Sequence, residues 1–333
     1  ILEHNRPAIL MSDGPIRPGI DSVTKETIDI ITGFQAAGNN DENLKKQIAC
    51  DACPGYGSCG GMFTYNTMQT FIGVVGMEPL HMISAPSDDR RRVEQYPDEL
   101  IKYLDAMITN EILPRDIVTR DSIRNAMVVA MAVGGSTNVL LHGPEIARAA
   151  GFRSFWDDIM SPEEFNNLSE NIVPVLVDAR PFGLYSMVDI DEKGGVQVIV
   201  KELLDAGLLD GSTLTCTGES LAQQVERLNP PSPDGEVIYR VEHPYKSTGG
   251  LRVLGGNLSP EFSAVLKLAG VEGGLENNIF KGKARVFDSE QSLLDELETN
   301  SLSFKHHDMI IVRYEGPSGA PGMPEMLDST SRI

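Results

Sequence analysis

The stretch Thr119-Arg-Asp-Ser-Ile-Arg-Asn-Ala-Met-Val-Val-Ala-Met-Ala-Val-Gly-Gly-Ser-Thr-Asn138 is the most informative part of this sequence for the fold. Asp121 or Ser122 can cap a helix through Ile123–Val133, which is apolar and rich in alanine and methionine. The glycine pair after this segment ends the helix, and Ser-Thr-Asn opens a second helix that stops at Gly151. We therefore expect two consecutive helices joined by a glycine turn.

Segments on either side of this stretch alternate between helical and strand patterns. Thr64–Val75 places apolar side chains on one helical face, Ser161 precedes a proline-led helix, and Val196–Leu204 is helical. Pro7–Met11 and Val173–Val177 are short apolar runs typical of buried strands. We expect an α/β domain over residues 1–228, layered as α/β/α.

The character of the chain changes after Leu228. Asn229–Gly235 holds three prolines and reads as a linker. Short β-rich runs separated by glycine turns follow it, with one helix at Glu290–Glu298; the runs are Val237–Val241, Leu251–Leu254, Ala284–Phe287 and Met309–Tyr314. We expect residues 229–333 to form a second, β-barrel-like domain.

Composition narrows the class of protein. The chain has 333 residues, with 28 basic against 48 acidic side chains and a net charge of -20. So negative a chain repels phosphate backbones, which makes a general nucleic-acid binder improbable. The longest apolar run, Asn125–Val133, is far below the roughly 18 residues that a membrane helix needs. We expect no nucleic-acid and no membrane partner.

Three of the four cysteines lie within ten residues, in Cys50-Asp-Ala-Cys53-Pro-Gly-Tyr-Gly-Ser-Cys59-Gly-Gly-Met. Thiolates suit zinc or an iron–sulfur cluster, and four cysteines are too few for a disulfide scaffold of this length. A zinc site lacks a second pair of ligands, because Cys216 is alone and no histidines pair nearby. By spacing alone, structural thiols and a cluster site both stay open, in a reduced compartment.

Two further segments carry polar groups suited to ligands. Ser136 and Thr137 stand at a helix start, where free N–H groups favour a carboxylate or phosphate, although from the residues alone plain helix capping is the better explanation. Glu315 follows a strand and precedes a Gly/Pro loop, a placement that suits a ligand of a hard metal but also a solvated carboxylate.

These blocks together resemble the dihydroxy-acid dehydratase family, which also includes sugar-acid and 6-phosphogluconate dehydratases. Ala52–Met68 is similar to the cluster segment of that family, and Val133–Asn138 and Arg313–Met326 are similar to two further blocks. Shorter matches occur in the same order at Lys201–Leu209, Gly256–Pro260 and Ala284–Asp288.

The resemblance implies dehydration of a 2,3-dihydroxy acid to a 2-keto acid with an iron–sulfur cluster, [2Fe–2S] or [4Fe–4S], and Mg²⁺. By position, Cys59 matches a cluster ligand, Glu315 matches a Mg²⁺ ligand, and Ser136 and Thr137 match contacts to the substrate carboxylate. The first domain would then carry the cluster cysteine and the second the Mg²⁺ glutamate. A role in branched-chain amino-acid biosynthesis, a cytoplasmic or organellar location and a homodimer or homotetramer are implied in the same way.

Part of the family's active site has no counterpart in this sequence. The family carries two more cluster cysteines and most Mg²⁺ ligands before the segment resembling Asn5–Ile9, and its base lies in a block beyond Ile333. We therefore expect no catalytic base within the chain and an incomplete part of such an enzyme. Two alternatives stay open, a sugar-acid dehydratase and a catalytically incomplete oligomerisation scaffold.

Overall fold

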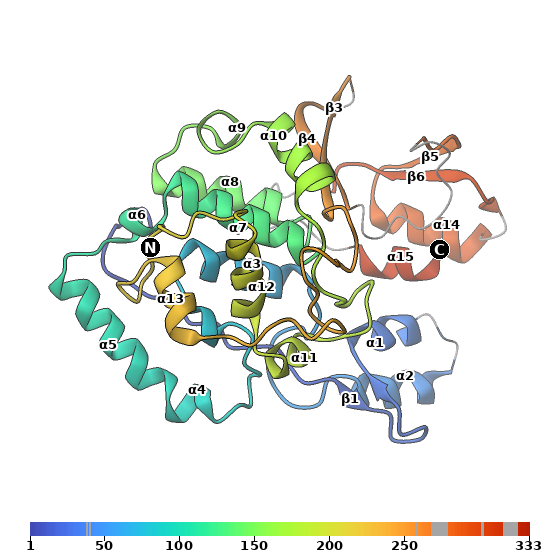
Figure 1. Cartoon of the computed structure of the whole chain (residues 1–333). Helices are drawn as coiled ribbons and strands as arrows, with labels where there is room; N and C mark the ends of the chain where they lie inside the picture. The colour runs from blue at the N-terminus through green and yellow to red at the C-terminus, as the bar shows by residue number, and fades with distance from the viewer. Residues whose placement is uncertain (38, 40, 258, 268–278, 301–302, 316–325) are drawn as a thin grey trace. The chain divides into compact units, whose positions relative to one another are not determined.

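The computed structural model describes the chain except for residues 38, 40, 258, 268–278, 301–302 and 316–325 (Figure 1). The chain divides into two compact units. Unit 1 comprises Ile1–Pro18 and Pro54–Gly270, and unit 2 comprises Gly19–Cys53 and Val271–Ile333. Each unit is therefore built from segments that are distant in the sequence.

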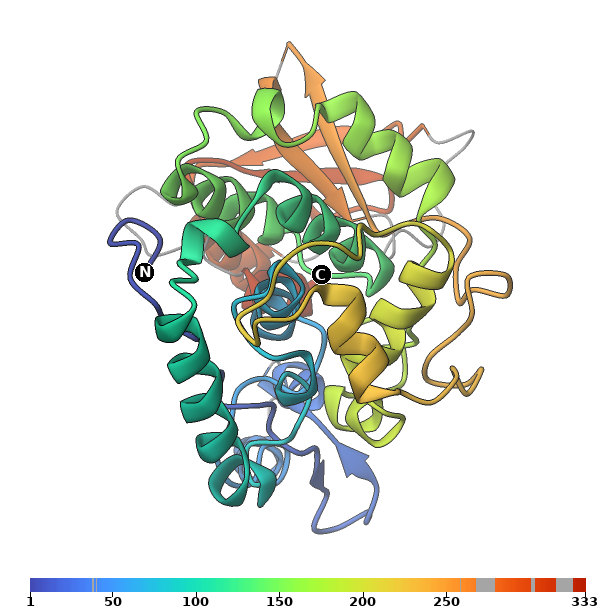
Figure 2. The same cartoon turned by 60° about the vertical axis from the view of Figure 1, so that its left-hand side comes forward.

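Unit 1 is mainly helical, as Figures 1 and 2 show. Its described helices are α3 (Thr64–Val75), η1 (Leu80–Met82), α4 (Arg91–Glu94), α5 (Tyr96–Thr109), α6 (Pro114–Ile117), α7 (Arg120–Ala132), α8 (Val139–Ala150), α9 (Phe155–Asp158), α10 (Pro162–Asn167), η2 (Leu168–Ile172), α11 (Met187–Glu192), α12 (Val196–Asp205) and α13 (Leu221–Leu228).

Helix α7 lies in the centre of the unit 1 core. From Ser122 to Ala132 every residue except Arg124 is buried, and α3, α8 and α12 all pack against it. Thr119, not Asp121, caps the helix by accepting from the backbone N–H of Ser122. The predicted pair of helices is confirmed, and α8 ends at Gly151, whose φ of 107° is left-handed.

The described strands of unit 1 form one antiparallel pair. β3 (Leu251–Gly256) pairs with β4 (Ser259–Lys267), and the register shifts between Leu254 and Gly256. The predicted strand Val173–Val177 is wrong as a sheet strand: it makes isolated bridges at Val175 and Val177. Its backbone is held instead by the helical core, since the N–H of Leu176 donates to the carbonyl of Ala132.

Unit 2 is a smaller assembly of short elements. β1 (Gly19–Ile20) pairs with β2 (Thr27–Ile28), and the parallel pair β5 (Lys283–Phe287) and β6 (Asp308–Val312) is connected through α14 (Glu290–Asn300). Its remaining described helices are α1 (Ile30–Ala37), α2 (Glu42–Asp51) and α15 (Leu327–Arg332).

The mixed α/β class is confirmed, but the expected layers are not. Each strand in the described ranges pairs with a single partner, so these residues form neither a barrel nor the wide central sheet of an α/β/α layer. The β-rich runs after Leu228 are also divided, with β3 and β4 in unit 1 and β5 and β6 in unit 2. Period-2 patterns identify strands, but the partner of a strand depends on distant sequence. A domain boundary at residue 228 stays a prediction.

No helix within the described part of the chain has the length and apolar character required to cross a membrane.

Candidate functional site

Cys59 lies half-buried in the loop that leads into α3. The buried side chain of Asn66, in the first turn of α3, reaches back to this loop. Its Nδ2 donates to the carbonyl oxygens of Cys59 and Gly61, each at 2.6 Å. The helix that follows the cysteine therefore fixes the backbone that carries the thiol.

A carboxylate from the N-terminal segment holds the other side of the same loop. Asp13 accepts from the hydroxyl of Ser58 at 3.0 Å and from the phenol of Tyr65 at 2.5 Å. The Tyr65 oxygen in turn accepts from the N–H of Gly14 at 2.9 Å. Burial and the hydrogen bond to Asp13 raise the pKa of Tyr65 to about 12, so this phenol stays a donor at neutral pH. We call Asp13, Ser58 and Tyr65 the loop clamp.

The glycine after Cys59 is required by a close approach of two backbones. A Cβ atom at Gly60 would lie 2.9 Å from the carbonyl oxygen of Ile16. That oxygen belongs to main chain, so a side chain at position 60 would force the two segments apart. The same glycine accepts from the N–H of Met187 at 2.7 Å, which ties the loop to the start of α11.

Ser136 also forms hydrogen bonds with the first turn of α3. Its N–H donates to the hydroxyl of Thr67 at 2.9 Å, and its Oγ lies 3.2 Å from the Oγ1 of Thr64. The Nδ2 of Asn138 also donates to Thr64, at 2.7 Å. The first turn of α3 thus joins the Cys59 loop to the start of α8, although these segments are far apart in the sequence.

Ser136 and Thr137 differ in how accessible their polar groups are. Ser136 is only 9% exposed, and its N–H and Oγ are engaged in the bonds just described. Thr137 is half-buried, and among the described residues neither its hydroxyl nor its N–H forms a hydrogen bond. Thr137 is therefore the better placed of the two to receive a ligand oxygen.

Glu315 lies in unit 2, shortly after the end of β6 at Val312, and is half-buried. Its Oε1 accepts from the backbone N–H of Glu290 at 2.8 Å. Glu290 is the first residue of α14, where free N–H groups favour a negative charge. One oxygen of the predicted Mg²⁺ ligand therefore stabilises a helix start, a role that the sequence did not reveal.

The cofactors implied by the family resemblance need more ligands than the described residues bring together. Within that part of the chain, no three His, Cys, Asp or Glu side chains gather as a metal site. Cys50 is exposed and Cys53 half-buried, both in unit 2, and Cys216 is buried in unit 1. Burial raises the pKa of the Cys216 thiol, which makes it a poor metal ligand. Cys59 and Glu315 could therefore each supply one ligand, to a cluster and to Mg²⁺ respectively, but the described residues do not form a complete site for either.

Several residues of the site were not found by sequence reasoning. Asp13 was not singled out by the sequence, and Thr64, Tyr65 and Asn66 were considered only as the start of the expected helix Thr64–Val75. The available signal was the density of polar side chains in the first turn of α3, directly after the glycine-flanked cysteine.

The sequence matches the models of one protein family along nearly its whole length. Residues 1–224 match the dihydroxy-acid/6-phosphogluconate dehydratase N-terminal model, and residues 236–333 match the corresponding C-terminal model. The chain belongs to the dihydroxy-acid/6-phosphogluconate dehydratase family, a class of enzymes that remove water from their substrates.

Similar curated proteins are named dihydroxy-acid dehydratases. The chain is 40% identical over 334 residues to the protein of Mycobacterium ulcerans (strain Agy99). The aligned region covers 98% of this chain and 57% of that protein. It is 39% identical to the chloroplastic protein of Arabidopsis thaliana, over 99% of this chain and 52% of the relative. The mitochondrial protein of Saccharomyces cerevisiae is 37% identical, with coverages of 99% and 56%. The chain thus spans just over half the length of these relatives.

Proposed function

We propose that this chain is part of a dehydratase that converts a 2,3-dihydroxy acid to a 2-keto acid. The observation that carries this proposal is the identity of about 40%, over nearly all of the chain, to proteins named dihydroxy-acid dehydratases. In this reaction a proton leaves C2 and hydroxide leaves C3, which together form water. The resulting enol takes up a proton at C3, loses the proton of its C2 hydroxyl and so becomes the 2-keto acid.

Within unit 1, Thr137 and Ser136 are proposed to contact the substrate carboxylate. The free hydroxyl and N–H of Thr137 stand at the start of α8, a helix of twelve residues, where the helix dipole favours an anion. Ser136 would act through its position, since its own polar groups are bound to the first turn of α3. A carboxylate held there would fix the orientation of the substrate carbon atoms.

Cys59 is proposed as one thiolate ligand of an iron–sulfur cluster, and Glu315 as one ligand of Mg²⁺. Such metals supply Lewis acids for a poor leaving group and a weakly acidic proton. Because the described residues bring together no complete set of ligands, the proposal assigns the chain one ligand of each group. The chain's own contribution is to hold Cys59 in place through Asn66 and the loop clamp.

The test uses the full-length protein, purified without oxygen, with 2,3-dihydroxyisovalerate as substrate and 2-keto acid formation as the signal. We expect Cys59→Ser to abolish turnover and to lower iron and acid-labile sulfide per chain. Cys216→Ser, a change at a buried thiol whose pKa is raised by burial, should retain the cluster. Equal loss of iron in both variants would show that the ligand is wrongly assigned.

A sugar-acid dehydratase is the second candidate, because the matched family model also covers 6-phosphogluconate dehydratases. The same assay with 6-phosphogluconate and with a non-phosphorylated sugar acid distinguishes the two. Turnover of a sugar acid at least tenfold faster than that of the branched dihydroxy acid would favour the second candidate. Absence of turnover with every substrate would overturn both.

A further inference from the structure

Unit 1 has a groove beside helices α3 and α8. Its lining includes Thr64 and Tyr65 from the first turn of α3, but the proposed function does not use its buried polar residues. Its volume is about 500 Å³, and its walls include the apolar side chains of Leu10, Met68, Ile72 and Ile146. Its lining also includes two buried polar residues, Glu78 and Gln69. A groove with apolar walls and a few buried polar groups is the usual form of a small-molecule site.

Both buried polar residues retain acceptor capacity. Glu78 is 2% exposed, and its Oε1 accepts from the N–H of Ser12 at 3.0 Å and from the Ser12 hydroxyl at 2.6 Å. Among the described residues, none donates to its Oε2. Gln69 is 3% exposed; its Nε2 donates to Ser12 and to the carbonyl of Ile83, whereas its Oε1 is buried without a partner. The groove thus offers a carboxylate oxygen that receives no hydrogen bond from the described residues and a buried amide oxygen without a partner, and both can accept from a donor.

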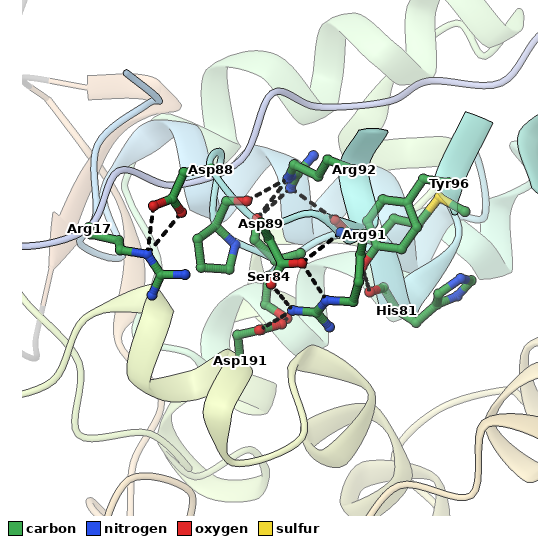
Figure 3. Close-up of polar contacts among 12 residues, drawn as sticks. Arg17, His81, Ser84, Asp88, Asp89, Arg91, Arg92, Tyr96 and Asp191 are labelled. Atoms are coloured by element: carbon green, nitrogen blue, oxygen red, sulfur yellow. Dashed lines mark hydrogen bonds and ion pairs between the residues drawn. The ribbon is translucent and has the colours of Figure 1, made fainter. Parts of the chain in front are cut away.

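The charges around Glu78 are fixed by the surrounding loops. The buried guanidinium of Arg92, labelled in Figure 3, donates to the carbonyl oxygens of Ser12 and Ala85. Ser12 in turn donates to Glu78, so it bonds to both charged groups. Burial raises the pKa of Glu78 to about 7, opposed by the Ser12 hydrogen bonds and by Arg92, while Asp13 raises it further. The remaining titratable neighbour is the buried thiol of Cys216. The carboxyl is thus partly ionised at neutral pH.

The rim of the groove adds little net charge. Glu145 lines it and forms an exposed ion pair with Arg148 at 2.6 Å, so the two charges largely cancel. The other titratable side chains of the lining are His142 and Tyr65, whose phenol donates to Asp13. The buried carboxyl of Glu78 therefore sets the charge preference of this apolar space.

We propose that this groove binds a small primary ammonium ion that carries a short aliphatic tail. An ammonium group has three N–H donors and no acceptor, which complements Glu78 Oε2 and Gln69 Oε1. Its bond to a carboxylate is charge-assisted and is stronger away from water. The tail would cover Met68, Ile72 and Ile146. The proposal is independent of the dehydratase reaction and does not use Cys59, Thr137 or Glu315.

The test titrates the protein with n-butylammonium chloride and follows ¹³C-labelled methionine methyl groups by NMR. Met68 and Met11 line the groove, so their signals should shift and saturate in the millimolar range or below, whereas Met160 serves as a remote internal control. 1-Butanol and sodium butyrate have the same tail with a neutral or an anionic head, and they should bind at least tenfold more weakly. Affinity for the ammonium ion should rise about tenfold from pH 6 to pH 8 as Glu78 ionises.

Two variants separate the head-group contact from the apolar wall. Glu78→Gln keeps the shape and the Ser12 bonds but removes the charge, and should weaken n-butylammonium binding at least tenfold and abolish its pH dependence. Ile146→Trp fills the apolar end and should weaken tail binding while leaving the Ser12–Glu78 bonds intact. Glu145→Gln is the matched control at the rim and should change the affinity less than twofold. Unshifted Met68 and Met11 signals, equal binding of 1-butanol, or undiminished binding by Glu78→Gln would each overturn the proposal.

Discussion

Glu78 is a residue whose burial makes the stability of the protein depend on pH. Its pKa is about 7 in the folded chain against an ordinary value of 4.5, so the folded state holds a proton that the unfolded state releases. The resulting stabilisation is complete below pH 4.5 and is lost as pH rises through 7. The side chain is 2% exposed, so solvent screens this effect little.

The free energy of unfolding of the wild type should fall between pH 5 and pH 8 as Glu78 ionises. We expect Glu78→Gln to make this decrease smaller by on the order of 3 kcal/mol. Urea unfolding of the wild type and the variant at both pH values measures this difference. Glu145→Gln, a change at an exposed carboxylate, should leave the slope unaltered. Parallel pH profiles of the wild type and Glu78→Gln would contradict the expected coupling.

The four cysteines should differ strongly in reactivity. Cys216 is fully buried and its thiol pKa is raised by burial, whereas Cys50 is exposed. Since the thiolate is the reactive form, iodoacetamide should label Cys50 at least a hundredfold faster than Cys216 in the native protein. Mass spectrometry of timed samples measures both rates, and unfolding in guanidinium should make them similar. Early labelling of Cys216 would mean that its region opens readily.

At the scale of elements, the turn between α7 and α8 depends on the absence of a side chain at Gly135. A Cβ atom there would lie 2.7 Å from the Thr67 methyl group and 2.9 Å from the backbone oxygen of Ala130. We expect Gly135→Ala to destabilise the protein by about 1–3 kcal/mol, because main-chain atoms cannot yield without moving both helices. Denaturant unfolding measures the change.

The control for this variant is Gly33→Ala in α1, where the nearest atom to the added methyl would be 3.9 Å away. Alanine has the higher helix propensity, so this variant should be neutral or slightly stabilising. If both glycine variants behaved alike, the close approach at Gly135 would not be the cause of the effect.

The loop clamp joins the Cys59 loop to the N-terminal segment. Tyr65→Phe removes the donor to Asp13 and the acceptor of the Gly14 N–H, and should cost about 1–2 kcal/mol. It should also raise the rate at which iodoacetamide modifies Cys59, because the loop loses one of the contacts that hold it. Tyr56→Phe, at a tyrosine that is 69% exposed, is the matched control. An unchanged Cys59 rate in Tyr65→Phe would show that the loop is held without the Tyr65 phenol.

At the scale of the whole molecule, the two units have very different cores. Unit 1 contains an extended set of buried side chains around α7, whereas the described core of unit 2 centres on Ile28, Ile48 and Ala52. In β6 of unit 2, half-buried and exposed residues alternate. A region that exposes more apolar surface when it opens locally has a higher free energy of opening.

We therefore expect backbone amides of α7 to exchange with deuterium at least a hundredfold more slowly than those of β5 and β6. Hydrogen exchange followed by mass spectrometry of peptides from both units measures the ratio. Comparable protection in α7 and β6 would show that the units open together, despite their separate cores.

The sequence alone determined the elements whose signals are local. Ser161 caps α10 through the N–H of Glu164, Gly151 ends α8, and Val196–Leu204 lies within α12, because each depends on residues a few positions apart. The quoted motifs also pointed to the family that the comparisons then established.

Only the tertiary structure decided how distant segments meet. The contact between Thr64 and Ser136 joins residues 72 positions apart, the bond between Ser12 and Glu78 spans 66, and Glu315 reaches the start of α14 across 25. The described residues form neither the expected barrel nor the expected layered sheet, because the pattern of a strand does not determine which strand it pairs with. Hydrogen bonds within one helical turn follow from neighbouring residues, whereas burial of Glu78 and pairing of strands depend on how the whole chain packs.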